Sequence, residues 1–236
     1  MAKKSAGNRM NHTERVAGGI FFLVYLLVLP LLVNKVFAFV GVLLGTEISD
    51  SLANVLYYYT IFAVTVLLFH SYIGKMTGRF LGNLNRSIGT YFAGLLGFYG
   101  ANELFYRLTH VIFGSHTNLN DMTIAAQINS APRMTALIVI VLAPFIEEVL
   151  FRGLVFGTIR ENSRPVAYVV SCALFAFLHV WTFALSNWDL GYFVLMLQYL
   201  VPGIVFAWAY EYSGTIWTAV ALHATVNALS LWTMAG

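Results

Sequence analysis

The sequence predicts an all-α polytopic membrane protein, a bundle of about seven transmembrane helices with a cytoplasmic N-terminus, and three observations support this. Hydrophobic residues make up 59% of the 236 residues and charged residues only 10%, whereas soluble domains carry roughly 25% charged residues. Apolar stretches of about 20 residues, long enough to cross the hydrocarbon core of a bilayer, recur along the chain. Basic residues gather in alternate connections between these stretches.

The composition also limits the partners and the location. No polar block is long enough to fold separately in water, so we expect residues 1–236 to form a single transmembrane domain. The formal charge of +3 is small, and we expect no nucleic-acid partner. The single cysteine, Cys172, excludes an internal disulfide and a multi-cysteine metal site, and its apolar surroundings indicate a buried thiol. The first apolar stretch lacks a cleavage pattern, so we expect no cleavable signal peptide. The lipid bilayer is a predicted partner, and the predicted location is the cell membrane, as a multi-pass protein of a prokaryotic plasma membrane.

Seven stretches are predicted to span the membrane: 16–44, 52–73, 88–113, 134–159, 166–186, 191–209 and 214–233. The first is overlong and contains Pro30, so it either kinks at the proline or ends near Val33. In the sixth, Pro202 precedes Gly203, where we expect a bend. The longest connection, 114–133, leaves room for a short amphipathic helix.

The distribution of charge predicts the orientation. Nine of the thirteen Lys and Arg residues precede the first span or fall between the second and third and between the fourth and fifth: Lys3, Lys4, Arg9, Arg15, Lys75, Arg79, Arg86, Arg160 and Arg164. In an alternating seven-span topology these three segments share one side. The opposite connections hold acidic residues, with Arg133 as their main basic residue: Glu47, Asp50, Asp121 and Asp189. Since Lys and Arg accumulate on the cytoplasmic side, the N-terminus is predicted to be cytoplasmic and the C-terminus outside.

Two adjacent glutamates interrupt the fourth span, in the stretch PFIEEVLFRGLVFG. Glu147 precedes Arg160 by thirteen residues, which places it about 20 Å from that end of the helix and well inside the hydrocarbon core. Charged groups at such a depth are costly and usually functional. Glu148 and Arg152 are spaced i,i+4 and can neutralise each other, whereas Glu147 points about 100° away and stays free to take or give a proton. The alternative is a buried ion-pair network that only fixes helix packing.

Two later spans bring polar side chains to the same layer. The fifth contains FAFLH, with His179 one turn after Phe175, and the seventh contains HATVN, with His223 one turn before Asn227. Counted by helical rise, His179 and Asn227 lie about 20 Å from the cytoplasmic side, level with Glu147, and His223 lies one turn lower. Each is ambiguous alone, because a histidine can bond a backbone carbonyl and an asparagine can join helices. Together they supply a base, a second proton-handling group and donors for an oxyanion.

Three motifs now stand in chain order: EEVLFR fits EExxxR, FAFLH fits FxxxH, and HATVN fits HxxxN. On these motifs, residues 140 to 232 resemble the CAAX proteases and bacteriocin-processing enzymes (the CPBP or Abi family), which include the endopeptidase that trims prenylated CAAX proteins. We expect the family-like catalytic core at about 134–233. The resemblance implies an intramembrane endopeptidase that hydrolyses a peptide bond in a membrane-associated, prenylated or precursor peptide.

The resemblance also implies the catalytic residues, namely Glu147, Glu148, Arg152, His179, His223 and Asn227. The first glutamate would activate the attacking water, assisted by the histidine of FxxxH. The histidine and asparagine of HxxxN would stabilise the tetrahedral oxyanion. The second glutamate and the arginine of EExxxR would support the first glutamate.

The cofactor expectation has two forms. Members of the family have often been called metalloproteases, and Glu147, His179 and His223 would make a three-ligand zinc site with an open position. The sequence has no HExxH motif, and a water activated by glutamate alone accounts for the same residues. The mechanism without a metal is therefore the expectation, and zinc is the alternative.

Two other functions compete with the protease. A non-catalytic membrane partner, in bacteriocin self-immunity or in the regulation of another membrane protein, would not need both the acid and the oxyanion donors. A proton-coupled transporter would use the same acidic layer, but the chain has no internal repeat of the kind that many transporters show. The complete set of motifs favours the protease, and its expected partner is a peptide or lipidated protein.

Overall fold

The computed structural model describes residues 10–113 and 119–235, and every regular element in these ranges is a helix. The first half contains α1 (His12–Leu23), the π-helix η1 (Val24–Val28), α2 (Leu29–Leu44), α3 (Asp50–Leu68), α4 (His70–Gly82), α5 (Leu84–Phe113) and α6 (Leu119–Ser130). The second half contains α7 (Pro132–Ala136), the π-helices η2 (Leu137–Leu142) and η3 (Glu148–Phe156) on either side of α8 (Ala143–Glu147), then α9 (Gly157–Arg160), α10 (Arg164–Leu178), α11 (Trp181–Asn187), the 3₁₀-helix η4 (Leu190–Tyr199), α12 (Leu200–Ser213) and α13 (Ile216–Ala235). The all-α prediction is confirmed.

Within the described ranges, fewer helices than the seven predicted have the length and hydropathy expected of a membrane span. By length and composition, four helical segments can cross a membrane: His12–Leu44, Asp50–Leu68, Pro132–Arg160 and Leu190–Ser213. The pair α10 and α11, bent by 44° at a short break, gives a fifth. Helices also form over the remaining two predicted stretches, as α5 and α13, but charged or polar side chains such as Glu103 and Asn227 lower the hydropathy of these stretches. The count of seven is therefore not confirmed.

The first helical segment passes its proline without ending. It continues from His12 to Leu44, so the helix itself does not end near Val33. The π-helix η1 lies directly before Pro30, and proline lacks the N–H that would continue the ladder of backbone hydrogen bonds. The wider π turn accommodates the proline within one continuous segment. The segment ends at Gly45, whose φ of 65° is the left-handed conformation typical of a glycine C-cap.

The fifth predicted span is broken at the histidine of FxxxH. The His179 Nδ1 atom donates to the Phe175 carbonyl at 2.8 Å, and the backbone N–H of His179 instead reaches Ala176 at 3.2 Å. A side chain that takes the carbonyl one turn earlier competes with the helix ladder, and α10 ends here. The break is a local consequence of the motif.

Other parts of the chain follow the expectations more closely. A helix forms within the 114–133 connection, as α6, and Cys172 is buried. The sixth predicted span begins as the 3₁₀-helix η4 and becomes α-helical at Leu200, two residues before Pro202. A change of helix type therefore lies where we expect a bend.

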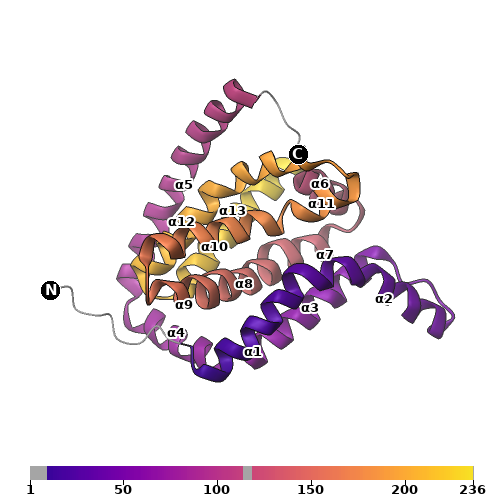
Figure 1. Ribbon diagram of the computed structural model, residues 1–236, viewed down its shortest axis with the longest axis horizontal. Helices are drawn as coiled ribbons and strands as arrows, with labels where there is room; N and C mark the ends of the chain where they lie inside the picture. The colour runs from indigo at the N-terminus through magenta and orange to yellow at the C-terminus, as the bar shows by residue number, and fades with distance from the viewer. Residues whose placement is uncertain (1–9, 114–118, 236) are drawn as a thin grey trace.

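The helix that carries the two glutamates lies in the centre of the bundle. In Figure 1, α8 and α9 run between α10 and α12 on one side and α1 and α3 on the other. In the most apolar window of Pro132–Arg160, 72% of the residues are buried inside the protein, compared with 17–28% in the other three long spans. Most of its side chains therefore meet protein, and a polar group there can be satisfied by neighbouring helices.

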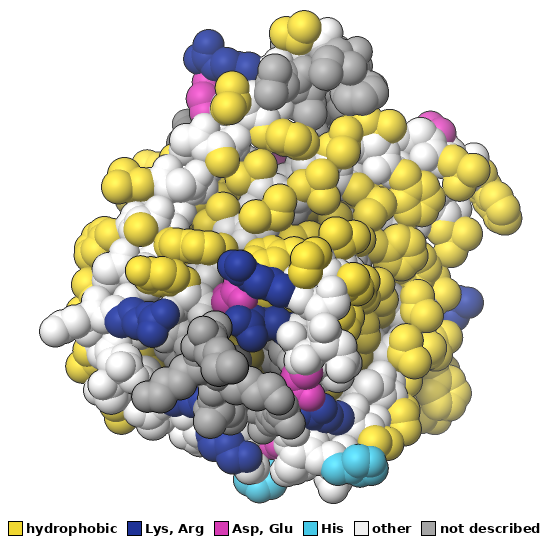
Figure 2. All heavy atoms as spheres, turned by 60° about the vertical axis from the view of Figure 1, so that its left-hand side comes forward, with side chains coloured by type: hydrophobic (Ala, Val, Ile, Leu, Met, Phe, Trp, Pro, Cys, Tyr) yellow, Lys and Arg dark blue, Asp and Glu magenta, His cyan; other side chains and the backbone are white. Residues whose placement is uncertain are grey.

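Two of the three segments predicted to share one side of the membrane are joined by ion pairs near one end of the bundle, while Lys3, Lys4 and Arg9 lie outside the described residues. Arg15 lies 2.5 Å from Glu161, which joins the start of α1 to the connection after α9. Arg160 and Arg164 both reach Glu211 near the end of α12, at 2.5 and 3.0 Å. Figure 2 shows this end, with Lys, Arg and acidic side chains gathered among apolar flanks. The assignment of this end to the cytoplasm stays a prediction.

Candidate active site

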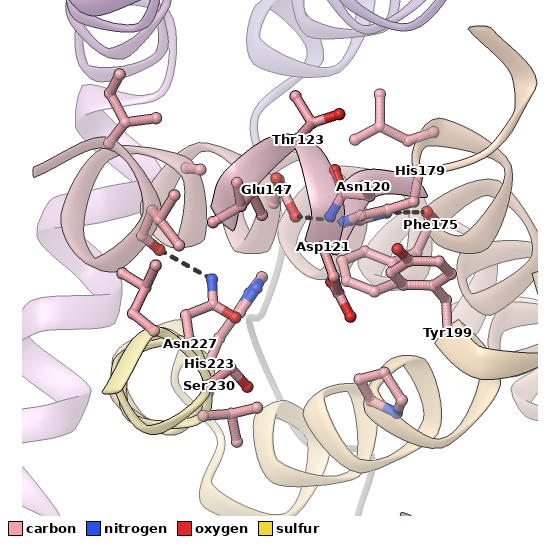
Figure 3. Close-up of a pocket in the computed structure, with 18 of the residues that line it drawn as sticks. Asn120, Asp121, Thr123, Glu147, Phe175, His179, Tyr199, His223, Asn227 and Ser230 are labelled. Carbon is pink, nitrogen blue, oxygen red and sulfur yellow. Dashed lines mark hydrogen bonds and ion pairs between the residues drawn. The ribbon is translucent and has the colours of Figure 1, made fainter. Parts of the chain in front are cut away.

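Four of the six motif residues line one cavity of about 750 Å³: Glu147, His179, His223 and Asn227. They come from α8, the end of α10, and α13, as the depth count predicts. Figure 3 shows them around one space, whose wall also carries the labelled residues of α6. Glu148 and Arg152 lie behind this wall and are fully buried.

Glu147 presents a carboxylate to the cavity. Its side chain is 8% exposed, and its Oε2 atom is buried without a hydrogen-bond partner among the residues that the structure describes. The Nε2 atom of His179 lies 4.0 Å from this oxygen, too far for a direct hydrogen bond. A buried polar atom without a partner is rare and calls for an explanation such as a catalytic role or a bound water.

His179 is held so that Nε2 faces the glutamate. Its Nδ1 atom is 2.8 Å from the Phe175 carbonyl and must carry the hydrogen of that bond, so Nε2 of the neutral ring is an acceptor. The ring stacks on Tyr199 at a centroid distance of 4.3 Å, and it packs against the Phe175 ring at 4.7 Å. The motif phenylalanine thus fixes the histidine through both its backbone and its ring.

A second group of charges lies directly behind the cavity wall. Glu148 Oε1 accepts a hydrogen bond from His223 Nδ1 at 2.9 Å and lies 3.1 Å from Arg152 NH1. The guanidinium donates to the Gly203 carbonyl at 3.2 Å and lies 4.4 Å from the Phe175 ring centroid. The predicted ion pair therefore forms, although residues 148–156 are π-helical rather than α-helical.

The carboxylate of Glu148 determines which nitrogen of His223 is available. Because Nδ1 bonds Glu148, the other ring nitrogen, Nε2, is the one left for chemistry in the cavity that His223 lines. The ring stacks on Phe206 at 4.5 Å with an interplanar angle of 22°. A carboxylate on one nitrogen and a stacked aromatic ring together fix the orientation of the imidazole.

Asn227 lies at the cavity wall but its amide is engaged elsewhere. The Nδ2 atom donates to the Val139 carbonyl at 2.8 Å, which joins α13 to η2 (the left-hand dashed line in Figure 3). An asparagine that joins two helices in this way has a structural role, which is the alternative to a catalytic role for the asparagine of HxxxN.

Sequence reasoning missed the α6 side of the cavity. Asn120, Asp121 and Thr123 line it as well, and Tyr199 of η4 adds a phenol group. Burial raises the pKa of the Asp121 carboxyl, while a hydrogen bond from Asn120 opposes this shift. The available signal was the polar sequence NLNDMT between two apolar stretches.

The three residues predicted as zinc ligands, Glu147, His179 and His223, all line the cavity. Within residues 10–113 and 119–235, no group of three His, Cys, Asp or Glu side chains is placed to hold a metal ion. Of the three predicted zinc ligands, His223 bonds Glu148 through Nδ1 and keeps Nε2 available, and the other two face each other at 4.0 Å. No step of the chemistry below is therefore derived through a metal.

Comparison with known proteins gives two matches. Residues 129–229 match the family model described as type II CAAX prenyl endopeptidase Rce1-like. The UPF0177 protein YxdF of Lactococcus lactis subsp. lactis (strain IL1403) is 29% identical over 87 residues, an alignment that covers 37% of this chain and 42% of that relative. No solved structure matches. The resemblance predicted from the three motifs is confirmed, since residues 129–229 of this helical, membrane-spanning protein match the type II CAAX prenyl endopeptidase Rce1-like family.

Proposed function

We propose that the protein is an intramembrane endopeptidase that hydrolyses a peptide bond in a membrane-associated, prenylated or precursor peptide. One observation carries the proposal most directly. Glu147 turns to a cavity inside the bundle a buried carboxylate oxygen that has no hydrogen-bond partner in the described part of the chain, and this oxygen lies beside the acceptor nitrogen of His179. Two acceptors that face each other at 4.0 Å are arranged to hold a molecule that donates two hydrogens.

That molecule is a water in the proposed mechanism. A water about 2.8 Å from both atoms would donate one hydrogen to Glu147 and the other to His179 Nε2, which leaves its oxygen lone pairs directed into the cavity. As this oxygen attacks the scissile carbonyl carbon, its proton passes to Glu147. The C–N bond of the tetrahedral intermediate then breaks, and the proton passes from Glu147 to the leaving amine.

The oxyanion of the intermediate needs a donor, and His223 is the one that the geometry favours. With a proton on Nε2, His223 would donate a hydrogen bond into the cavity, while its Nδ1–H group continues to donate to the Glu148 carboxylate. Arg152 in turn offsets the charge of Glu148 in the fully buried layer behind the wall. The ion pair of EExxxR thus supports the site through His223 as well as through Glu147.

The size of the cavity limits what it holds. At about 750 Å³ it falls within the range of roughly 300–1,000 Å³ typical of ligand pockets, so it accommodates a few extended residues around a scissile bond rather than a folded protein. Amide side chains on its wall, among them Asn54, Asn102 and Gln198, suit the backbone of a peptide. A lipid anchor on the substrate would remain in the surrounding bilayer.

The experiment uses the purified full-length protein in detergent with a quenched fluorescent peptide library, half of it C-terminally lipidated. Wild type is compared with Glu147→Gln and with a matched control, Glu103→Gln, which makes the same chemical change in an exposed pair with Arg107. Cleavage by wild type and the control, reduced about 10²–10⁴-fold in Glu147→Gln, supports the proposal. Equal cleavage by all three proteins contradicts it.

A further inference from the structure

The π-helix before the first glutamate leaves one backbone carbonyl without its expected donor. In η2 the hydrogen bonds run to the carbonyl five residues earlier, and the Ala143 N–H donates to Ile138 in this register. The next donor in the series would be residue 144, for the Val139 carbonyl. Residue 144 is proline, which has no N–H, so the ladder of backbone hydrogen bonds is interrupted at this point.

The side chain of Asn227 supplies the missing donor. Its Nδ2 atom lies 2.8 Å from the Val139 oxygen, a normal hydrogen-bond distance. Within the membrane a backbone carbonyl without a partner is costly, because lipid offers no replacement donor. A polar side chain from a neighbouring helix is one of the ways in which proline within membrane helices is accommodated.

This bond acts on the short helix that carries the proposed base. α8 contains only five residues, from Ala143 to Glu147, and lies between the π-helices η2 and η3. α13 contacts this region on both sides of α8: Asn227 bonds Val139 before it, and His223 bonds Glu148 directly after it. The one-turn spacing of HxxxN thus places two side chains on one face of α13, and together they hold the turn between them.

We propose that Asn227 is a positioning residue, which replaces the backbone donor missing at Pro144 and thereby fixes Glu147 against the cavity. This proposal rests on the proposed function for its effect on catalysis. It differs from the role that the family resemblance implies, because an amide N–H that bonds Val139 does not stabilise an oxyanion with the same hydrogen. His223 is then the oxyanion donor, and Asn227 acts through the geometry of Glu147.

The test uses the proline to make the asparagine unnecessary. Pro144→Ala restores a backbone N–H at residue 144, which can complete the hydrogen bonds of this turn without Asn227. Four full-length proteins are compared in the same detergent: wild type, Asn227→Ala, Pro144→Ala and the double variant. Melting temperature is measured for each, together with kcat and KM on a peptide that wild type cleaves.

The proposal predicts that the effects of the two substitutions are not additive, either on the melting temperature or on kcat. Asn227→Ala alone should lower the melting temperature and reduce kcat about 10²-fold with little change in KM, since the base is displaced. The same substitution made in the Pro144→Ala background should lower the melting temperature and kcat only slightly. Loss of kcat with an unchanged melting temperature, or the same loss in both backgrounds, overturns the proposal and favours a direct oxyanion contact.

The melting temperatures also separate this inference from the proposed function. They require no substrate, so they test the link between Asn227 and Pro144 even if no peptide is cleaved by wild type. Additive melting temperatures in the four proteins would show that the asparagine does not replace the missing donor. Absence of cleavage by wild type would instead count against the peptidase.

Discussion

The carboxylate of Glu148 accepts a hydrogen bond from His223 Nδ1 at 2.9 Å, across 75 residues of sequence. The contact joins the first motif to the third and orients the histidine whose ring lines the cavity. The same oxygen lies 3.1 Å from Arg152, so one carboxylate serves an ion pair and a histidine together. Of the two acidic residues of EExxxR, Glu147 thus lines the cavity, and Glu148 lies behind it and bonds His223 and Arg152.

Substitution of Glu148 should lower both the stability of the protein and its activity, each for a different reason. Glu148→Gln leaves the buried Arg152 without its counter-ion, and removal of one partner of a buried pair costs about 3–5 kcal/mol of unfolding free energy. It also removes the carboxylate that orients His223, for which we expect a loss in kcat of about 10–100-fold. Thermal unfolding in detergent and peptide cleavage measure the two effects.

A double variant provides the control for that loss. Replacing both partners, Glu148→Gln with Arg152→Met, should recover much of the stability because no unpaired charge stays buried. The activity should remain low, since His223 still lacks its carboxylate. Recovery of both quantities would show that Glu148 only neutralises the arginine.

His179 should affect the chemical step rather than the fold. His179→Ala removes the nitrogen that faces Glu147, and we expect a loss in kcat of about 10²–10⁴-fold. The stacking partner Tyr199 offers a milder comparison. Tyr199→Leu leaves the bond between His179 and Phe175 in place, so its loss in kcat should be smaller. A larger loss from the tyrosine would contradict the assignment of the proton-handling role to the histidine.

Packing of the first helix depends on one of two adjacent glycines. A Cβ added to Gly18 would lie 2.6 Å from a carbon of the fully buried Phe69 ring, whereas a Cβ on Gly19 would meet nothing within 4 Å. Gly18→Ala should therefore destabilise the protein by about 1–3 kcal/mol through overpacking. Gly19→Ala should be neutral or stabilising by about 0.5–1 kcal/mol, because alanine favours the helix. Melting temperatures of the two variants that agree would contradict the tight contact between α1 and the α3–α4 junction.

The carboxyl group of Asp121, which lies outside the predicted membrane spans, should make the stability of the protein depend on pH. Burial raises the pKa of its carboxyl in the folded protein, so the folded state binds this proton more tightly than the unfolded state. Stability should then rise as the pH falls through the window between the ordinary carboxyl pKa and the raised one, and fall as the pH rises through it. Asp121→Asn should remove this part of the slope. Melting temperatures measured across acidic pH check it, and identical slopes for the two proteins would contradict the burial of this carboxyl group.

The motif residues were predictable because charge is rare in this chain. A carboxylate pair in an apolar helix and two histidines at the same depth each indicate function from the sequence, and counting rise along ideal helices placed them together. Glu147 lines the cavity and Glu148 turns to Arg152, as the angular separation predicts. The local i,i+4 spacing is reliable here because a short-range pair depends little on the rest of the fold.

Other features depend on tertiary context that spacing does not contain. The π-helices at 24–28 and 137–142 each lie just before a proline, and their register is visible only in the backbone hydrogen bonds. The break after His179 follows from a side-chain bond that competes with the helix. The α6 side of the cavity arises from a connection whose polar sequence gives no indication of what it packs against.

The most direct measurement of the central claim is the rate of one cleaved peptide, with wild type assayed before and after treatment with a strong zinc chelator, beside Glu147→Gln. We predict that the wild-type rate survives chelation and that the Glu147→Gln rate falls about 10²–10⁴-fold, as expected for a water activated by glutamate. A wild-type rate lost on chelation and restored by zinc would contradict the account and support the three-ligand site at Glu147, His179 and His223. An unchanged rate in Glu147→Gln would remove the proposed base altogether.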